Sequence, residues 1–221
     1  MKHVLFLSAA AAAALSLAAC NKPADNSATN AASNTADAAG NAASNTADTA
    51  GAAVNKAQDA TGAAVGATSA NTMGSRDTGA FVSNASQSDM YEIQAGQIAQ
   101  KRSKNPDVKA FGKMMVADHT AMSNAMKPLI GAAGQTPADK LDQRRQGFID
   151  NLNQASDADF DKVYIDQQVA GHQEALDLMN GYAKDGPDAG LKGGAAKAAP
   201  KVQAHLDKAK AIQAKVAAAK K

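Results

Sequence analysis

Aromatic residues and cysteines are scarce in this 221-residue chain. It contains no tryptophan, five phenylalanines, three tyrosines and one cysteine, Cys20. A single cysteine cannot form an intramolecular disulfide or supply a cysteine-based zinc or redox site. The formal net charge is only +2, and no basic stripe is interleaved with aromatic residues. These absences argue against nucleic acid as a partner.

Strand-like alternation of apolar and polar residues is also missing, so no β-strand is predicted. Capping residues instead mark four long helices, predicted from Asp77 to about Lys104, Asn105 to about Ile130, Ser156 to about Gly186, and Asp188 onwards. A shorter helix is predicted from Thr136–Asp139 to Gln154, and Pro200 is expected to kink the fourth long helix or mark its start. We therefore predict an all-α fold, a ferritin-like four-helix bundle with a short extra helix in the crossover between its second and third helices.

Residues 1–19 have the pattern of a signal peptide. A basic start at Lys2 is followed by the apolar run 4–17, which is shorter than a membrane-spanning helix. The sequence Leu17-Ala18-Ala19-Cys20 resembles a bacterial lipobox, which implies cleavage before Cys20 and diacylation of its sulfur. The residue after Cys20 is not the aspartate that resembles an inner-membrane retention signal. We therefore expect an exported protein, attached by its lipid to the outer membrane and facing the periplasm.

Residues 20–76 are predicted to be a lipidated, disordered, low-complexity tether. They consist almost wholly of small and polar residues, and an eleven-residue sequence at 30–40 recurs nearly unchanged at 41–51. Such a segment cannot bury enough apolar surface to offset its conformational entropy. The remaining residues, 77–221, have the length of one domain, to which we assign the helical bundle.

Four ionisable residues, one in each long helix, fall within the predicted apolar stripes: Glu92, His119, His172 and His205. An unsatisfied polar group in such a stripe costs several kcal/mol, about 2–7 by transfer measurements. Counted from the turns near residues 105 and 187, Glu92 and His119 lie nearly level. His172 and His205 differ by roughly 4 to 5 Å in height. We therefore expect a single cluster near the middle of the bundle.

One glutamate and three histidines form a suitable ligand set for one Zn, Fe, Mn or Cu ion. A di-iron centre is not predicted, because that site needs Glu-x-x-His pairs, whereas valines precede all three histidines by three positions. A buried hydrogen-bond network is the competing interpretation, with Asp118, Asp161, Tyr164 or Gln168 as polar neighbours.

Methionines suggest a second kind of metal site. Met115, Met122 and Met126 share one face of the second predicted helix with His119. Thioether and imidazole ligands together suit Cu(I) outside the cytoplasm. Methionine is more often an apolar core residue, so this pattern alone does not decide between copper binding and packing.

The folded part resembles the bacterial domain of unknown function 4142 family, a ferritin-like group of exported and often lipidated envelope proteins. The matching segments are Phe81-Val82, Glu92-Ile93, the run 105–111, Met115-Val116-Ala117-Asp118-His119, the run 160–165 through His172, and Pro200 with His205-Leu206. The resemblance covers about Gly79 to Ala211 and leaves out the tether. It implies a helical bundle, but no established reaction, substrate or metal.

These features favour a lipid-anchored envelope protein that is not an enzyme and binds one metal ion at the Glu/His cluster. A metal-dependent redox or stress-protective enzyme, with these four residues as ligands and Tyr164 nearby, is the first alternative. A structural or interaction module, whose cluster is only a hydrogen-bond network, is the second. The predicted partner is a membrane, reached through the N-terminal lipid; no protein partner follows from the sequence.

Overall fold

The structure, a computed structural model, describes residues 76–219. Its helices are α2 (Thr78–Arg102), α3 (Pro106–Ala132), α4 (Gln143–Gln154), α5 (Phe160–Asp185) and α6 (Ala189–Ala218). No strand occurs among these residues, which confirms the all-α prediction. The predicted signal peptide, the lipidation site Cys20 and the tether up to residue 75 lie outside the described residues.

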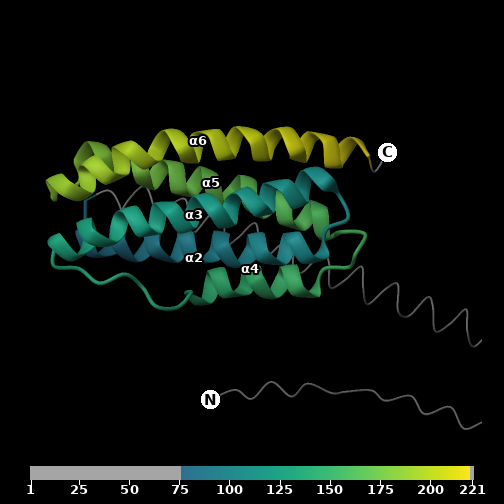
Figure 1. Cartoon of the computed structure of the whole chain (residues 1–221), viewed down its shortest axis with the longest axis horizontal. Coiled ribbons are helices and arrows are strands. Elements are labelled where there is room, and N and C mark those ends of the chain that lie inside the picture. Colours follow the sequence, from purple (N-terminus) through teal and green to yellow (C-terminus); the bar gives the residue numbers. More distant parts are fainter. Residues whose placement is uncertain (1–75, 220–221) are drawn as a thin grey trace, which may run out of the picture. The chain divides into compact units, whose positions relative to one another are not determined.

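The four long helices lie side by side along their lengths, as Figure 1 shows. Helix α2 packs against α3 and helix α5 against α6, so each pair forms a helical hairpin. The hairpins meet where α3 contacts α6 and where α2 contacts α5. The short helix α4 packs against α2 and α5 on the outside of this bundle.

Side-chain caps begin three of the long helices where the sequence predicts them. Asp77 Oδ1 accepts a hydrogen bond from the Ala80 amide at 2.6 Å, and Asp188 Oδ1 accepts one from the Leu191 amide at 2.8 Å. Asn105 Oδ1 accepts from the Asp107 amide at 2.9 Å, directly before a proline in the first turn of α3. Each cap satisfies an amide that has no partner inside its helix.

The predicted start of the short helix is wrong. Helix α4 begins at Gln143, where Asp142 Oδ1 accepts a hydrogen bond from the Arg145 amide at 2.7 Å. The preceding segment is nonhelical because it is held against α2, with the Ala138 amide donating to Ser86 Oγ at 2.9 Å. The helix predicted from Ser156 begins later, at Phe160, because Ser156 Oγ accepts a hydrogen bond from the Asp159 amide at 3.2 Å in the turn before α5, and the N-cap residue Asp159 makes no side-chain capping bond.

Pro200 does not mark the start of the last helix, since α6 runs from Ala189 to Ala218 through it. A proline inside a helix loses one backbone hydrogen bond. Pro200 is exposed, so water can reach the carbonyl that loses its partner. Exposure therefore makes this proline tolerable at a position where a buried one would break the helix.

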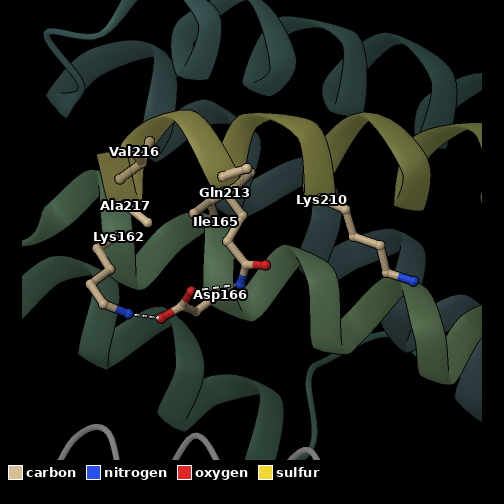
Figure 2. Close-up of a pocket in the computed structure, with 8 residues that line it drawn as sticks. Lys162, Ile165, Asp166, Lys210, Gln213, Val216 and Ala217 are labelled. Atoms are coloured by element: carbon tan, nitrogen blue, oxygen red, sulfur yellow. Dashed lines mark hydrogen bonds and ion pairs between the residues drawn. The ribbon is translucent and has the colours of Figure 1, made fainter. Parts of the chain in front are cut away.

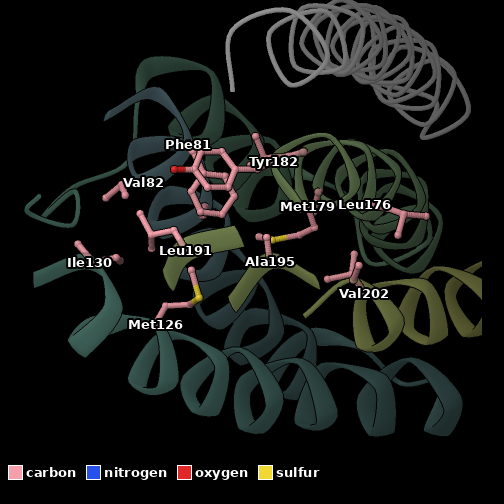
Figure 3. Close-up of a cluster of buried hydrophobic side chains, with 14 of the residues drawn as sticks. Phe81, Val82, Met126, Ile130, Leu176, Met179, Tyr182, Leu191, Ala195 and Val202 are labelled. Atoms are coloured by element: carbon pink, nitrogen blue, oxygen red, sulfur yellow. The ribbon is translucent and has the colours of Figure 1, made fainter. Parts of the chain in front are cut away.

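The core consists of two apolar clusters. The first contains Phe81, Tyr182, Leu191 and Leu206 among others, and its Phe81 and Tyr182 rings stack with centroids 3.8 Å apart (Figure 3). The second contains Phe111, Tyr164 and Ile212 among others and occupies the other half of the bundle. On α3 and α5, an ionisable residue singled out in the sequence lies between the two clusters.

Helices α2 and α3 approach most closely at two glycines. A Cβ atom added to Gly112 would lie 2.8 Å from the Gly96 carbonyl oxygen and 2.9 Å from Ala99 Cβ. A Cβ added to Gly96 would lie 2.6 Å from the Gly112 carbonyl oxygen. Neither contact leaves room for a methyl group, so these glycines set the distance between the two helices.

Gly112→Ala should therefore destabilise the domain by about 1–3 kcal/mol, because the helices must move apart. Gly131→Ala is the matched control on the same helix, since an added Cβ there meets nothing within 4 Å. The control should stabilise the domain by about 0.5–1 kcal/mol through the lower entropy of its unfolded chain. Urea denaturation monitored by circular dichroism measures both changes, and equal effects would contradict the proposed close approach.

Candidate metal centre

The four ionisable residues singled out in the sequence meet at one level of the bundle. Glu92, His119, His172 and His205 come from α2, α3, α5 and α6, and each is only 1–3% exposed. The three imidazole rings, here called the histidine triad, have centroids 5.4–5.6 Å apart. The height difference expected between His172 and His205 does not keep their side chains apart.

Each ring of the histidine triad is fixed through one nitrogen. His119 Nδ1 donates to Asp89 Oδ1 at 2.8 Å, and His205 Nε2 donates to Asp118 Oδ2 at 2.8 Å. His172 Nδ1 donates to the Gln168 carbonyl oxygen at 2.9 Å. Carboxylate and carbonyl oxygens only accept hydrogen bonds, so each of these nitrogens carries the proton. In the neutral ring, the opposite nitrogen then carries a lone pair.

The opposite nitrogens are buried and have no hydrogen-bond partner among the described residues. They are Nε2 of His119, Nε2 of His172 and Nδ1 of His205. One nitrogen from each ring lies within 4.8 Å of one nitrogen from each other ring. Three nitrogens bound to one ion at about 2.1 Å would lie about 3.4 Å apart. The triad therefore needs only small side-chain shifts to hold a metal ion.

Glu92 lies beside the histidine triad. Its Oε1 atom is 3.7 Å from His172 Nδ1, and its Oε2 atom has no hydrogen-bond partner among residues 76–219. Burial raises the pKa of Glu92 from 4.5 to about 7, although the charge of His119 acts in the opposite direction. The carboxyl group is therefore partly protonated near neutral pH, and a cation at the triad would favour its ionised form.

Burial favours the neutral form of all three rings. It holds the pKa of His172 well below its usual value, and the charge of His119 adds to this effect. It also lowers the pKa of His205, despite the hydrogen bond to Asp118. At His119 burial is outweighed by the hydrogen bond to Asp89 and the charge of Glu92, so the pKa is raised. His172 and His205 are thus neutral and able to coordinate at pH 7.

Because the pKa of Glu92 is raised, ionisation of its carboxyl group should destabilise the metal-free protein as the pH rises. A carboxyl group whose pKa rises on folding contributes stability below pH 4.5, and that contribution is lost as the pH approaches 7. Glu92→Gln removes the ionisation and should stabilise the metal-free domain at pH 8 by about 2–3 kcal/mol. At pH 4.5 the two proteins should be nearly equal in stability. Urea denaturation at both pH values tests this, and an equal difference at both would contradict it.

Two further polar side chains lie next to this centre on α5. The Tyr164 hydroxyl and both side-chain amide atoms of Gln168 are buried and have no partner among the described residues. Burial raises the pKa of Tyr164 well above its usual value, and the negative charge of Glu92 raises it further. Together with Glu92 and the histidine triad, Tyr164 and Gln168 form what we call the polar layer.

The other polar residues expected near the cluster lie in different places. Asp118 is part of the centre, because it fixes His205 and also accepts a hydrogen bond from Lys201 at 3.1 Å. Asp161 is not brought to the centre. Its carboxylate accepts a hydrogen bond from Ser103 at 2.6 Å, and it precedes His172 on α5 by about three turns, or roughly 16 Å.

Asp89 is the functional residue that sequence reasoning missed. It is one turn before Glu92 on α2, outside the predicted apolar stripe, and it contacts the centre only through His119. The sequence signal for Asp89 is weak. It is an acidic residue one turn from Glu92, on the helix that packs against α3. A partly exposed aspartate at such a position usually faces solvent, so only the packing of α2 on α3 reveals its role.

The methionines expected at a Cu(I) site are divided between the two halves of the core. Met115 is buried in the second apolar cluster, and Met126 is buried in the first, with Met122 packed against it. Methionine sulfur in these positions fills apolar space on either side of the polar layer. The arrangement favours packing over a shared copper site for these three residues.

A surface groove between α5 and α6 lies apart from the polar layer (Figure 2). Its lining includes Ile165, Val216 and the polar side chains Lys162, Asp166 and Gln213. Lys162 pairs with Asp166, and Gln213 Nε2 donates to Asp166 Oδ1 at 2.8 Å. These three polar groups satisfy one another, whereas Lys210, which also lines the groove, forms no ion pair among the described residues.

A buried ion cluster on the other side of the bundle joins α4 to α5. Glu174 receives two hydrogen bonds from Arg144, at 2.7 and 2.9 Å, and one from Arg145 at 3.0 Å. Arg145 is 4% exposed and also pairs with Asp142. Burial lowers the pKa of Arg145, with the charge of Arg144 acting in the same direction. Asp142 and Glu174 offset the cost of burying the Arg145 guanidinium charge, so the ion cluster fixes α4 against the bundle.

The family model described as Domain of unknown function (DUF4142) matches residues 63–212, more than half of the chain. The chain belongs to this family. The family match begins at residue 63, so the expected limit at Gly79 is wrong, and part of the predicted tether belongs to the matched region. No curated protein and no solved structure matches the chain. The family is defined without a function, so any function must be argued from the polar layer.

No helix among residues 76–219 is both long enough and apolar enough to cross a membrane.

Proposed function

We propose that this member of the DUF4142 family is a lipid-anchored, periplasm-facing protein whose helical domain binds one transition-metal ion at the histidine triad. The domain is proposed to be a ferritin-like four-helix bundle, with Glu92 as a fourth ligand or as the counter-charge of the ion. The antiparallel helical hairpins and the inward-facing ligands from four helices support this comparison.

One observation carries the metal proposal: three buried rings converge, and each has one nitrogen without a partner among the described residues, while its opposite nitrogen is fixed. Hydrogen bonds that the rings donate to Asp89, Asp118 and the Gln168 carbonyl oxygen orient the rings and select their tautomers. Metal-binding histidines are typically held in this way by carboxylate or carbonyl groups. A hydrogen-bond network would instead pair the inner nitrogens with one another or with protein groups, because unpaired buried polar atoms each cost about 1–3 kcal/mol.

The ligand chemistry suits a divalent ion of intermediate softness. Neutral imidazole with an adjacent carboxylate binds Zn²⁺, Fe²⁺, Mn²⁺ or Cu²⁺. Valines stand three positions before each histidine, at Val116, Val169 and Val202, so the Glu-x-x-His pairs of a di-iron centre are missing. The proposal is therefore one ion per chain.

Metal analysis of the purified 77–221 domain tests this proposal. After dialysis against each of the four ions, we expect close to one equivalent of at least one of them by elemental analysis. Binding at a concentration of one hundred times Kd should add about 2.7 kcal/mol to the free energy of unfolding, and chelation should remove it. Less than a tenth of an equivalent, with no change in thermal melting for any ion, would leave the hydrogen-bond network as the better explanation.

The proposed attachment to the outer membrane is supported by the apolar run 4–17 and the sequence Leu17-Ala18-Ala19-Cys20. Metabolic labelling of the full chain with an alkyne fatty acid tests it. The wild-type chain should be labelled and sediment with outer membranes, whereas Cys20→Ala should be unlabelled and absent from the outer-membrane fraction. An unlabelled wild-type chain would contradict lipidation without affecting the metal proposal.

A further inference from the structure

The unpartnered polar atoms of the polar layer outnumber what a metal ion can satisfy. Among the described residues, the buried side-chain nitrogen and oxygen atoms without a hydrogen-bond partner all belong to this layer. They are Glu92 Oε2, His119 Nε2, Tyr164 Oη, Gln168 Nε2, Gln168 Oε1, His172 Nε2 and His205 Nδ1. The histidine nitrogens account for three, and four atoms on Glu92, Tyr164 and Gln168 remain.

These remaining atoms share one side of the centre. Tyr164, Gln168 and His172 follow one another at four-residue intervals on α5, so they lie on one face of that helix. Glu92 on α2 faces the same surface, because a Cβ atom added to Gly171 would lie 3.4 Å from Glu92 Oε1. The short distance from Glu92 Oε1 to His172 Nδ1 connects this group to the triad.

The chemistry of these groups suits a small oxygen-donor ligand. The Tyr164 hydroxyl and the Gln168 amide nitrogen can donate hydrogen bonds, whereas the Glu92 carboxylate and the Gln168 amide oxygen can accept them. A water molecule or hydroxide ion both donates and accepts. The absence of a side-chain cation among these groups, Glu92 being acidic, disfavours a multiply charged anion such as phosphate.

We infer that Glu92, Tyr164 and Gln168 form a ligand subsite that holds a water molecule or hydroxide ion bound to the metal, so that the centre keeps one exchangeable coordination position. This inference rests on the proposed metal site. Three histidines with a solvent ligand in the fourth position are the arrangement found in catalytic rather than structural metal centres. Tyr164 and Gln168 are positioning residues for that ligand.

Electron paramagnetic resonance of the Cu²⁺-loaded full chain separates the two proposals. Couplings to ring nitrogens of three histidines report the metal site, and coupling to ¹⁷O in ¹⁷O-enriched water reports the solvent ligand. Both couplings are expected. Nitrogen couplings without ¹⁷O coupling would overturn the subsite and leave the metal site standing. Loss of the nitrogen couplings would overturn the metal site and the subsite with it.

Azide, a small monoanion that replaces metal-bound water, provides the second measurement. Its dissociation constant should rise roughly five- to tenfold in Tyr164→Phe and in Gln168→Leu, because each variant loses one hydrogen bond to the ligand. Tyr182→Phe is the matched control, a buried tyrosine on the same helix whose hydroxyl lies 3.0 Å from Thr78 Oγ1. The control should bind azide like the wild type. Equal azide affinity in all of these proteins would contradict the subsite.

Thermal melting gives a test that does not require azide. Tyr164→Phe removes a hydroxyl that lacks a protein partner, so the metal-free variant should melt at or above the wild-type temperature. In the metal-loaded state the same variant should melt below the wild type, since the solvent ligand loses its donor. Tyr182→Phe should melt lower in both states. If Tyr164→Phe changes the melting temperature equally with and without metal, the proposed contact of the Tyr164 hydroxyl with the ligand would be contradicted.

Discussion

Replacing His172 by leucine should abolish the response of the domain to metal ions. The variant keeps a buried side chain of similar volume and removes the Nε2 lone pair that the triad needs. We expect a loss of affinity of at least about a hundredfold, because even residues that only orient a metal ligand contribute about ten- to a hundredfold. At a metal concentration that stabilises the wild type by about 2.7 kcal/mol, the variant should gain less than about 0.5 kcal/mol.

The metal-free His172→Leu variant separates the two interpretations of the polar layer. If the inner nitrogen has no protein partner, its removal should change the metal-free stability by less than about 1 kcal/mol. If the layer were a satisfied network, the same change would leave partners unpaired and cost about 1–3 kcal/mol. Met126→Leu, a buried change in the first apolar cluster, is the control and should keep the full metal response.

Replacing Glu174 by glutamine should cause the largest loss of stability among these variants. Glutamine keeps the shape of the side chain and removes the charge that offsets the buried Arg145 guanidinium. Removing one partner of a buried ion pair typically costs about 3–5 kcal/mol, because the other charge stays buried without compensation. We expect the lower part of that range, since Arg145 keeps its contact with Asp142. Urea denaturation at pH 7 measures the change.

Asp157→Asn is the control for this prediction. Asp157 also forms two ion pairs, with Arg102 at 3.3 Å and Lys104 at 3.2 Å, but its side chain is 66% exposed. Water and salt screen both pairs, so the denaturation midpoint should hardly change. A similar loss of stability in both variants would show that the burial of Arg145 does not determine the effect.

The polar layer has a cost that the two apolar clusters must offset. Seven buried nitrogen and oxygen atoms of this layer have no hydrogen-bond partner among residues 76–219, whereas the clusters on either side bury large side chains such as Phe81, Phe111 and Tyr182. An apolar layer in the same position would be more stable in the absence of a ligand. The presence of these polar groups in one buried layer, despite this loss of stability, is the physical reason to assign the layer a binding role.

Several features of the fold could be predicted from local sequence. Asp77, Asn105 and Asp188 begin helices because a short polar side chain can accept a bond from a nearby amide, which is a property of adjacent residues. The start of α4 could not be predicted in this way. Thr136 and Pro137 are good helix-starting residues, but a hydrogen bond from the Ala138 amide to Ser86, far away in sequence, holds that segment nonhelical.

The candidate site was predictable to a similar extent. Helical periodicity places Glu92, His119, His172 and His205 in apolar stripes, because burial repeats with the helical turn. Periodicity says nothing about which atoms of facing helices meet. The contact of Asp89 with His119 and the division of the methionines between two clusters depend on the rotation and height of packed helices.

The sequence alone determined the helical class of this protein, its family and the four inward-facing ionisable residues, because each depends on residue type and spacing along the chain. The tertiary structure decided that three rings converge, each with one nitrogen that has no partner among residues 76–219, whereas the four-residue spacing of Tyr164, Gln168 and His172 places them on one face of α5. The triad joins residues from three helices across distances in sequence that no local pattern spans. These contacts depend on how the helical hairpins pack, and the proposal that the polar residues bind a metal ion is based on them.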